Sequence, residues 1–340
     1  MLSVSLYAGS GDEWDTFVRG QHGWSFCHLY AWRRVMERAL EHEGLYLEAR
    51  FANGELAGVL PLVRVRSRLF GHFLVSMPFL SYGGPIGSPD AVRSLAAEAT
   101  RLAVEQDATL LELRSRHAQP LDLEVSHRKI TVVLDLPADV DALHRGYGGK
   151  LRSQIRRPEK EGITVRLGPD QVAPFHQVFT QHMRYLGTPT HRLAFFREIV
   201  DAFGDDVWCG CAYLGDVPVA AGLGFRSGGE FEMTWASAIA AHNRLSPNML
   251  LYATFLDRAV GEGLSVFNFG RCTPGGGTHR FKQQWGTRDE QLWWYQHSKS
   301  GDASTPSPSE GKYGLAVKAW QRLPLWVTNR VGPHIVRLIP

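Results

Sequence analysis

The most constraining feature of the sequence is a pattern of strands and turns that occurs twice. In the first half, NGELAGVLPL from Asn53 follows an apolar stretch and begins with an Asn-Gly turn, which is a strong hairpin signal. In the second half, GDVPVAAGLGF from Gly215 has the same form, and the later segments ATLLELR from Ala108 and LSVFNFGR from Leu264 also correspond. This pattern predicts two copies of one α/β module in tandem. The alternative is chance similarity between two short hairpins.

Helical periodicity fills in the two predicted modules. We expect a helix over 28–40, a second helix that Asp90 caps, and a third after Ser246-Pro247. A helical segment over 139–161 connects the modules. The prediction is an α/β (α+β) fold of two tandem domains with mixed sheets flanked by helices and a C-terminal helical tail. The predicted parts are an N-terminal domain over 1–135, a C-terminal domain over 136–298, a polar linker over 299–312 and a basic amphipathic tail over 313–340.

The predicted tail carries apolar and basic residues and no acidic residue. A basic amphipathic segment can lie on an anionic membrane surface. The alternative is a helical segment that packs back on the body and breaks at Pro324 and Pro333. The basic residues from Lys312, at the end of the linker, to Pro340 are Lys312, Lys318, Arg322, Arg330 and Arg337.

Charge and cysteine content exclude several classes of function. A net charge of +3 is too small to indicate nucleic-acid binding by bulk attraction. No pair of the four cysteines has zinc-ligand spacing, so we expect no bound metal and a reducing compartment. The sequence has neither a secretory signal pattern nor an apolar run of membrane-spanning length. We expect a cytoplasmic protein with peripheral contact, at most, on the inner face of the cytoplasmic membrane. The cysteines are Cys27, Cys209, Cys211 and Cys272.

The stretch from 263 to 286 predicts a site for a negative charge. A short apolar strand ends in Gly270-Arg271 and a glycine-rich turn, and Lys282 follows between Phe281 and Trp285. A lysine held against apolar surface interacts more strongly with charge, so Lys282 and Arg271 are the predicted oxyanion-stabilising residues. The alternative is a surface lysine whose stem covers the aromatic rings.

Other catalytic patterns are weak or missing. Tyr252, early in the helix after Pro247, can be a proton donor or an ordinary core tyrosine; Glu232 and His279 are weaker candidates. No Gly-Lys-Ser or Gly-Lys-Thr follows the glycines, so a P-loop does not fit. The run NRLSPN, which ends at Asn248, stands where a coenzyme A acetyltransferase carries its phosphate cradle, and this argues against ordinary acetyl-coenzyme A use.

The densest basic stretch, KLRSQIRRPEKEG from Lys150, predicts a second anion site. On a helix, Arg152 and Arg156 share one face, and two guanidinium groups can bind phosphate through charge-assisted hydrogen bonds. The alternative is a solvated helix face.

Several of these blocks together resemble a known family. KLRSQIRRPEKEG, SPNMLLY, VFNFGRC and HRFKQQWG resemble the signature blocks of the FemAB-like branch of the GNAT acyltransferase superfamily. AWRRVMERAL, PFLSYGGPIG and AWQRLPLWVTNRVGPH make the resemblance closest to the proteins found with exosortase/PEP-CTERM exopolysaccharide systems. The resemblance extends over nearly the whole chain and implies two GNAT-like domains.

The resemblance also implies roles for individual residues. Fem enzymes transfer an aminoacyl group from aminoacyl-tRNA to an amine of a cell-wall precursor, and other relatives use other acyl donors. The family's Phe-Lys pair corresponds to Phe281 and Lys282. The residues we expect to bind substrate are the family's basic-helix positions Lys150, Arg152 and Arg156, together with Phe281, Trp285 and Asn248 of SPNMLLY.

Two departures from the family bear on the donor. Asn268 stands where many relatives carry Asp, and no long heptad segment corresponds to the tRNA-binding arm, so aminoacyl-tRNA is disfavoured as the donor. The predicted function is an N-acyltransferase acting on an amine of a cell-envelope or exopolysaccharide precursor. We expect no bound cofactor and no DNA partner. The expected co-substrate is an acyl donor, either acyl-coenzyme A or aminoacyl-tRNA. The alternative is a non-catalytic module that binds polysaccharide or a lipid-linked precursor at the membrane.

Overall fold

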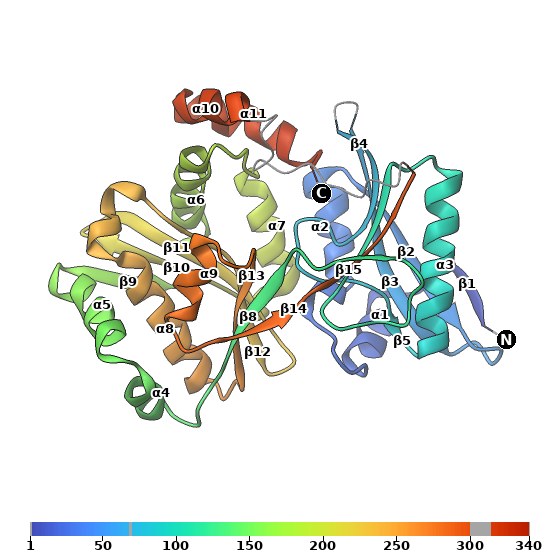
Figure 1. Ribbon diagram of the computed structural model, residues 1–340, viewed down its shortest axis with the longest axis horizontal. Helices are drawn as coiled ribbons and strands as arrows, with labels where there is room; N and C mark the ends of the chain where they lie inside the picture. Colours follow the sequence, from blue (N-terminus) through green and yellow to red (C-terminus); the bar gives the residue numbers. More distant parts are fainter. Residues whose placement is uncertain (1, 68–69, 300–313, 340) are drawn as a thin grey trace. The chain divides into compact units, whose positions relative to one another are not determined.

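The chain folds into two units, each built around its own sheet (Figure 1). The computed structural model describes residues 2–67, 70–299 and 314–339. Of these residues, unit 1 contains 2–67, 70–130, 291–299 and 337–339, and unit 2 contains 131–290 and 314–336. Most of the predicted linker, from 300 to 312, lies outside the described residues.

Unit 1 is an eight-stranded sheet in the order β1-β2-β3-β4-β6-β15-β7, with β5 paired to β3. The predicted Asn-Gly hairpin is confirmed as β2 and β3, which pair antiparallel. Helix α3 packs its alanine- and leucine-rich side against β2, β3 and β6, and this packing forms the core of the unit. The strands are β1 (Ser3–Leu6), β2 (Glu43–Arg50), β3 (Leu56–Ser67), β4 (Gly71–Ser76), β5 (Ile86–Gly87), β6 (Leu110–Ser115), β7 (Glu124–Ser126) and β15 (Trp293–Ser298). The helices are α1 (Gly11–Arg19), η1 (Phe26–His28), α2 (Ala31–Leu40) and α3 (Pro89–Glu105).

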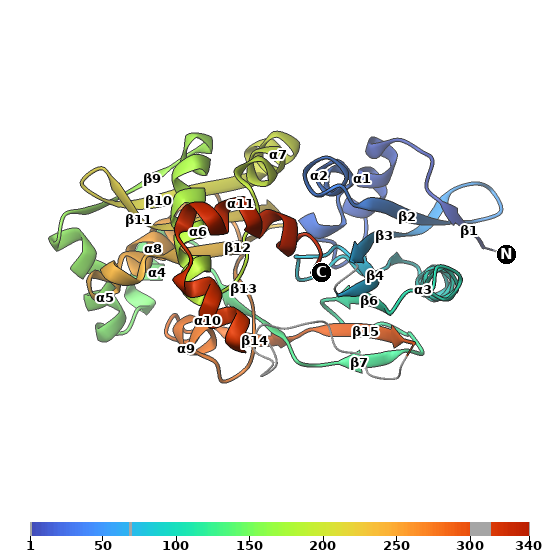
Figure 2. The ribbon, with the colours of Figure 1, turned by 90° about the horizontal axis from the view of Figure 1, so that it is seen from above.

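Unit 2 is a seven-stranded sheet in the order β14-β8-β13-β12-β11-β10-β9. The predicted second hairpin is confirmed as β10 and β11. Figures 1 and 2 show α7 and α8 on opposite faces of this sheet. The strands are β8 (Ile130–Asp135), β9 (Ile163–Leu167), β10 (Val207–Leu214), β11 (Val217–Ser227), β12 (Glu230–Ala238), β13 (Val266–Cys272) and β14 (Arg288–Gln291). The helices are α4 (Val140–Gly146), α5 (Gly149–Lys160), η2 (Pro169–Gln171), α6 (Val172–Leu186), α7 (Leu193–Phe203), η3 (Gly204–Asp206), η4 (Ala240–Leu245), α8 (Pro247–Gly261), α9 (Gly277–Gln283), α10 (Gly314–Arg322) and α11 (Leu325–Val336).

The two units repeat one connection. In unit 1, β4 pairs parallel with β6, and α3 lies between them in the chain. In unit 2, β12 pairs parallel with β13, and α8 lies between them. A parallel pair needs such a crossover, and a helix between the strands is the usual way to make it. The sequence repeat therefore corresponds to a structural one.

Three predictions about the elements need correction. Strand β15, predicted in the second domain, pairs with β6 and β7 of unit 1, because its partners are distant in sequence and local pattern cannot reveal them. Ser88, not Asp90, caps α3: its hydroxyl accepts from the backbone N–H of Ala91. Pro333 does not break the tail, since it lies inside α11 near its end, where only one backbone hydrogen bond is lost.

The tail helices α10 and α11 pack on α6, as the packed alternative predicted. The Arg184 guanidinium donates to the carbonyl oxygen of Leu323 at 3.1 Å, and the Gln321 amide donates to that of Tyr185 at 2.9 Å. Within the described residues, no helix has the length and apolar character needed to cross a membrane.

Candidate functional site

The central strands of unit 2 separate at one end. Strands β12 and β13 pair over three residues, up to Glu232 and Asn268, and both strands continue beyond that point. The pairing of β12 with β11 is irregular in the same region, between Leu223 and Phe225. Such an irregularity bends a strand locally. We call the place where the regular pairing of β12 with β13 ends, just past Glu232 and Asn268, the notch.

Lys282 occupies this notch. Its Nζ atom donates to the carbonyl oxygen of Gly270 at 2.6 Å and to that of Arg271 at 3.0 Å. The side chain is 3% exposed, and burial lowers its pKa from 10.5 to about 8. Lysine is therefore still mostly protonated at neutral pH, and the predicted partner Arg271 lies beside it through its backbone carbonyl. A buried lysine with a pKa this low is a functional-site candidate.

Gly270 makes this close approach possible. Its φ of +76° belongs to the left-handed region, and a Cβ atom there would lie 2.8 Å from the carbonyl oxygen of Met233 in β12. A side chain at this position would thus push β12 and β13 apart. Glycine is required here both by backbone conformation and by space.

The predicted aromatic residues Tyr252, Phe281 and Trp285 pack on one another. Tyr252 of α8 stacks on Phe269 of β13, with ring centroids 5.4 Å apart and planes 9° apart, and meets Phe281 edge-on at 5.2 Å. Trp285 completes the cluster, 6.1 Å from Tyr252 and 5.9 Å from Phe269. Burial raises the pKa of Tyr252 well above its ordinary value, so the hydroxyl stays protonated at neutral pH.

Asn268 lies fully buried beneath the notch. Its Oδ1 atom accepts from the Thr131 hydroxyl at 2.6 Å and from the backbone N–H of Gly270 at 2.8 Å, and its Nδ2 donates to Glu230 at 2.8 Å. Glu232 lies 3.5 Å from the same Nδ2. An aspartate here would add a third carboxylate and could not donate. The amide therefore suits the neighbours of this chain, and it orients Gly270.

His279 anchors the glycine-rich turn that precedes Lys282. Its Nδ1 atom accepts from the backbone N–H of Gly275 at 2.9 Å, so Nε2 carries the proton and donates to Asp289 at 2.9 Å. His279 was only a weaker candidate from the sequence, because its partner Asp289 belongs to β14 and nothing in the spacing links the two residues. The hydrogen bond between His279 and Asp289 joins α9, which carries Lys282, to strand β14 of the sheet.

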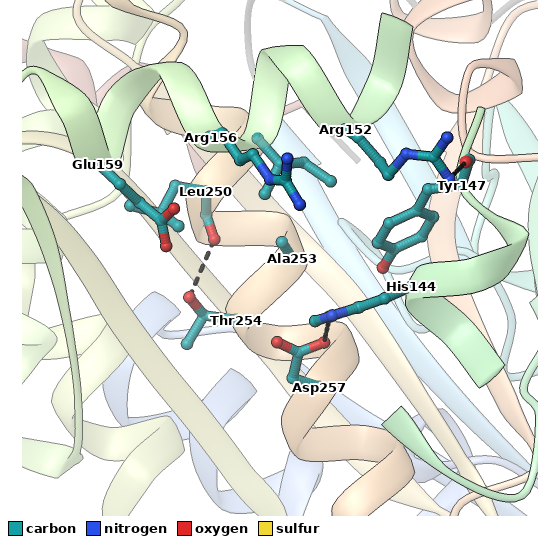
Figure 3. Close-up of a pocket in the computed structure, with 10 residues that line it drawn as sticks. His144, Tyr147, Arg152, Arg156, Glu159, Leu250, Ala253, Thr254 and Asp257 are labelled. Carbon is teal, nitrogen blue, oxygen red and sulfur yellow. Dashed lines mark hydrogen bonds and ion pairs between the residues drawn. The ribbon is translucent and has the colours of Figure 1, made fainter. Parts of the chain in front are cut away.

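The basic helix lines a cavity, as the sequence predicted for one of its faces. The cavity has a volume of about 220 Å³ and lies among α4, α5 and α8. Figure 3 shows Arg152 and Arg156 projecting from α5 toward it, opposite His144 and Asp257. Its lining residues are His144, Tyr147, Arg152, Ile155, Arg156, Glu159, Leu250, Ala253, Thr254 and Asp257.

The two arginines differ in their partners. Arg152 donates to the carbonyl oxygen of Tyr147 at 2.7 Å, whereas Arg156 neither hydrogen-bonds nor ion-pairs with any residue in the described ranges. The Asp257 carboxylate across the cavity is already paired, because His144 Nε2 lies 2.8 Å from its Oδ1 atom. Arg156 is thus a cation available to a ligand. Lys150 is exposed and Asn248 half-buried, and neither lines this cavity.

Tyr147, which sequence reasoning missed, connects the cavity to the aromatic cluster of Tyr252, Phe269, Phe281 and Trp285. It lines the cavity and meets Trp285 edge-on, with centroids 5.8 Å apart. The Tyr147 hydroxyl and the Trp285 indole N–H are buried and lack a hydrogen-bond partner among the described residues. A buried polar group without a partner is costly, so both groups can gain from a polar ligand.

The equivalent notch of unit 1 is filled. Arg114 of β6 is buried and donates to Glu112 at 2.7 Å and to the carbonyl oxygen of Leu80 at 3.1 Å. Its guanidinium lies 4.5 Å from the ring centroid of Trp294 on β15. In unit 1 this position is thus filled by Arg114, whose guanidinium is used in contacts within the protein. The candidate site therefore belongs to unit 2.

The family comparison agrees with this location. Residues 147–283 match the family of acetyltransferase (GNAT) domains. The match begins at the cavity residue Tyr147 and includes Lys282. Among curated proteins, none matches the chain significantly.

Solved structures match nearly the whole chain. The crystal structure of FemX is 14% identical, covers 85% of this chain and 96% of its own, and has a TM-score of 0.64. L-PGS from Bacillus licheniformis is 11% identical over 92% of this chain and 98% of its own, with a TM-score of 0.55. A tandem GNAT protein from the clavulanic acid biosynthesis pathway is 12% identical over 89% and 100%, with a TM-score of 0.52. The predicted fold of two tandem GNAT-like modules with mixed sheets is confirmed.

Proposed function

We propose that unit 2 is an N-acyltransferase site centred on Lys282. The observation that carries the proposal is a buried ammonium group, held by two backbone carbonyls where β12 and β13 separate, within the GNAT-matching segment. Two of its three N–H bonds are used by Gly270 and Arg271. In this proposal the third donates to the oxygen of a reacting carbonyl. The cation would then stabilise the negative charge that develops there.

In this proposal, the amine nitrogen of the acceptor attacks the carbonyl carbon of an activated acyl ester or thioester. The C–N bond forms, and the carbonyl electron pair moves to an oxyanion beside Lys282. Collapse of this intermediate breaks the bond to the leaving alcohol or thiol. The amine proton passes to water, and the leaving group takes a proton from water or from Tyr252. Burial raises the pKa of the Tyr252 hydroxyl, which makes it a weak acid, so Tyr252 can protonate an alkoxide leaving group but not a thiolate, which takes its proton from water.

The cavity supports a phosphate-bearing substrate. Arg152 and Arg156 present two guanidinium groups to it, and Arg156 has no partner among the described residues. Coenzyme A esters, aminoacyl-tRNA and nucleotide-linked amino sugars all carry phosphate, so the cavity does not choose among them. The envelope or exopolysaccharide acceptor and the link to exosortase systems remain predictions from the sequence motifs.

The test is native mass spectrometry of the purified chain with acyl-coenzyme A species, aminoacyl-tRNA and nucleotide-linked amino sugars. We expect one donor to bind and to leave an acylated acceptor. Lys282→Ala should reduce turnover by about a hundredfold or more, the usual effect of removing one oxyanion donor. Arg156→Ala should raise KM with little change in kcat, because phosphate binding is common to ground and transition states.

Lys160→Ala, an exposed lysine of α5 outside the cavity, is the matched control and should keep wild-type turnover. Circular dichroism checks that Lys282→Ala is folded. Full turnover in a folded Lys282→Ala protein would refute the catalytic role. A sugar- or lipid-linked ligand that binds unchanged over time, with or without Lys282, would favour the non-catalytic binding module instead.

A further inference from the structure

The tail helices have one side that packs on unit 2. Gly332 of α11 lies so close to Thr190 that a Cβ atom would be 3.2 Å from the Thr190 backbone, and Gly187 after α6 is similarly close to Val317 of α10. The hydrogen bonds from Arg184 and Gln321 join the same surfaces. Figure 2 shows both helices lying over α6. Their inward sides are therefore already used.

The outward sides of α10 and α11 carry large apolar residues. Leu315 is 84% exposed and Trp326 is 71% exposed, the highest values among the large apolar side chains in the described part of the chain. Single exposed apolar residues are ordinary on protein surfaces. Here two lie on adjoining helices, and Tyr185 and Leu186 are also exposed at the end of α6 that α10 covers. The two most exposed large apolar side chains of the described residues thus lie on the two tail helices.

The same outward sides are positively charged. Lys318 and Arg322 are exposed on α10 and share a helix face with Leu315, at spacings of three, four and seven residues. Arg330 is exposed on α11, four residues after Trp326. None of these cations has a hydrogen-bond or ion-pair partner within the described ranges, and residues 314–339 contain no Asp or Glu. The charge of this face is therefore not neutralised within the described structure.

We propose that the outward face of α10 and α11, defined by Leu315, Lys318, Arg322, Trp326 and Arg330, docks the protein on an anionic lipid bilayer. Apolar side chains at the level of the headgroups, flanked by lysine and arginine, are what such a surface binds. Tryptophan favours this interface because its ring is apolar and its N–H can stay hydrated. The docking is peripheral, since the helices lie on α6 and are too short to span. It is independent of the proposed acyl transfer.

Charge complementarity favours lipid over other partners. A nucleic acid would use the cations but would leave Leu315 in water, and a protein partner would need an acidic apolar surface of matching shape. A bilayer satisfies both the charges and the apolar side chains without a specific shape. Each basic residue near an anionic surface contributes about fivefold in binding, so three contribute about a hundredfold.

The test is co-sedimentation of the full chain with vesicles of phosphatidylcholine mixed with phosphatidylglycerol, and with vesicles of phosphatidylcholine alone. We expect binding to the mixed vesicles that salt weakens, and little binding to the neutral ones. The triple variant Lys318→Glu, Arg322→Glu, Arg330→Glu should lose about a hundredfold or more in the partition coefficient. The double variant Leu315→Ala, Trp326→Ala should also lose binding while keeping its charge.

Two matched controls separate this face from general effects. Arg19→Glu, Arg93→Glu, Arg128→Glu makes the same change in net charge at exposed positions of unit 1, and Val104→Ala removes an exposed apolar side chain there. Both should bind the mixed vesicles like wild type. The proposal is overturned if the wild type does not bind the mixed vesicles, or if the charge control loses as much vesicle binding as the triple tail variant. It is also overturned if polyuridylic acid binds through this face and vesicles do not. Circular dichroism confirms that each variant is folded.

Discussion

Lys282 should make the stability of this protein depend on pH in a way that needs no substrate to measure. Folding buries its ammonium group and lowers its pKa from 10.5 to about 8. Between these two pH values the unfolded chain holds a proton that the folded chain has released. Stability rises with pH wherever the unfolded state binds more protons. The free energy of unfolding should therefore increase from pH 8 to 10.5 relative to a variant that lacks this group.

The magnitude follows from the size of the shift. A difference of about 2.5 pKa units corresponds to about 3 kcal/mol at ~1.4 kcal/mol per unit. Lys282→Met keeps most of the apolar stem and removes the titrating group. At neutral pH the wild type bears the full cost of the buried charge, offset by its hydrogen bonds to Gly270 and Arg271. As pH rises that cost is relieved in the wild type only.

The assay is urea unfolding of wild type and Lys282→Met, followed by tryptophan fluorescence from pH ~7 to pH ~10. The free energy of unfolding of the wild type, relative to that of Lys282→Met, should rise by about 2 to 3 kcal/mol across this range. Lys160→Met, which changes an exposed lysine, should track the wild type with no such trend. A pH-independent difference between wild type and Lys282→Met would mean that the ammonium is hydrated, and the description of Lys282 as a buried cation would be wrong.

Two further sets of substitutions test the geometry of the two notches. Gly270→Ala and Gly263→Ala both place alanine at positive φ, +76° and +73°, but only at position 270 would the Cβ atom meet another strand. Gly263→Ala should cost about 1 kcal/mol of stability in urea unfolding and Gly270→Ala about 1 to 3 kcal/mol more; equal losses would contradict the close approach of β12. In unit 1, Arg114→Met should cost about 3 to 5 kcal/mol, because it leaves the Glu112 carboxylate buried without its cation. Glu112→Leu combined with Arg114→Met should recover most of this loss, and a double variant as unstable as Arg114→Met would argue against a buried ion pair.

Local sequence patterns were sufficient for most of the fold. The Asn-Gly turn after β2, the alternating strands and the periodic helices are determined by neighbouring residues, so both hairpins and the tandem repeat were predicted correctly. The helix cap of α3 and the strand partners of β15 could not be predicted from local patterns. Ser88 and Asp90 both suit a helix start, and the backbone conformation decides between them. Strand β15 joins unit 1 through partners far away in the chain.

The candidate site divides in the same way. The sequence by itself determined that a lysine follows a glycine-rich turn among aromatic residues, and that Arg152 and Arg156 share a helix face, because these relations depend only on spacing. Only the tertiary structure decided that Lys282 is buried with a lowered pKa, and that Tyr147 joins its aromatic cluster to the arginine cavity. Burial and pKa depend on which distant segments exclude water from a group, and no local pattern records that.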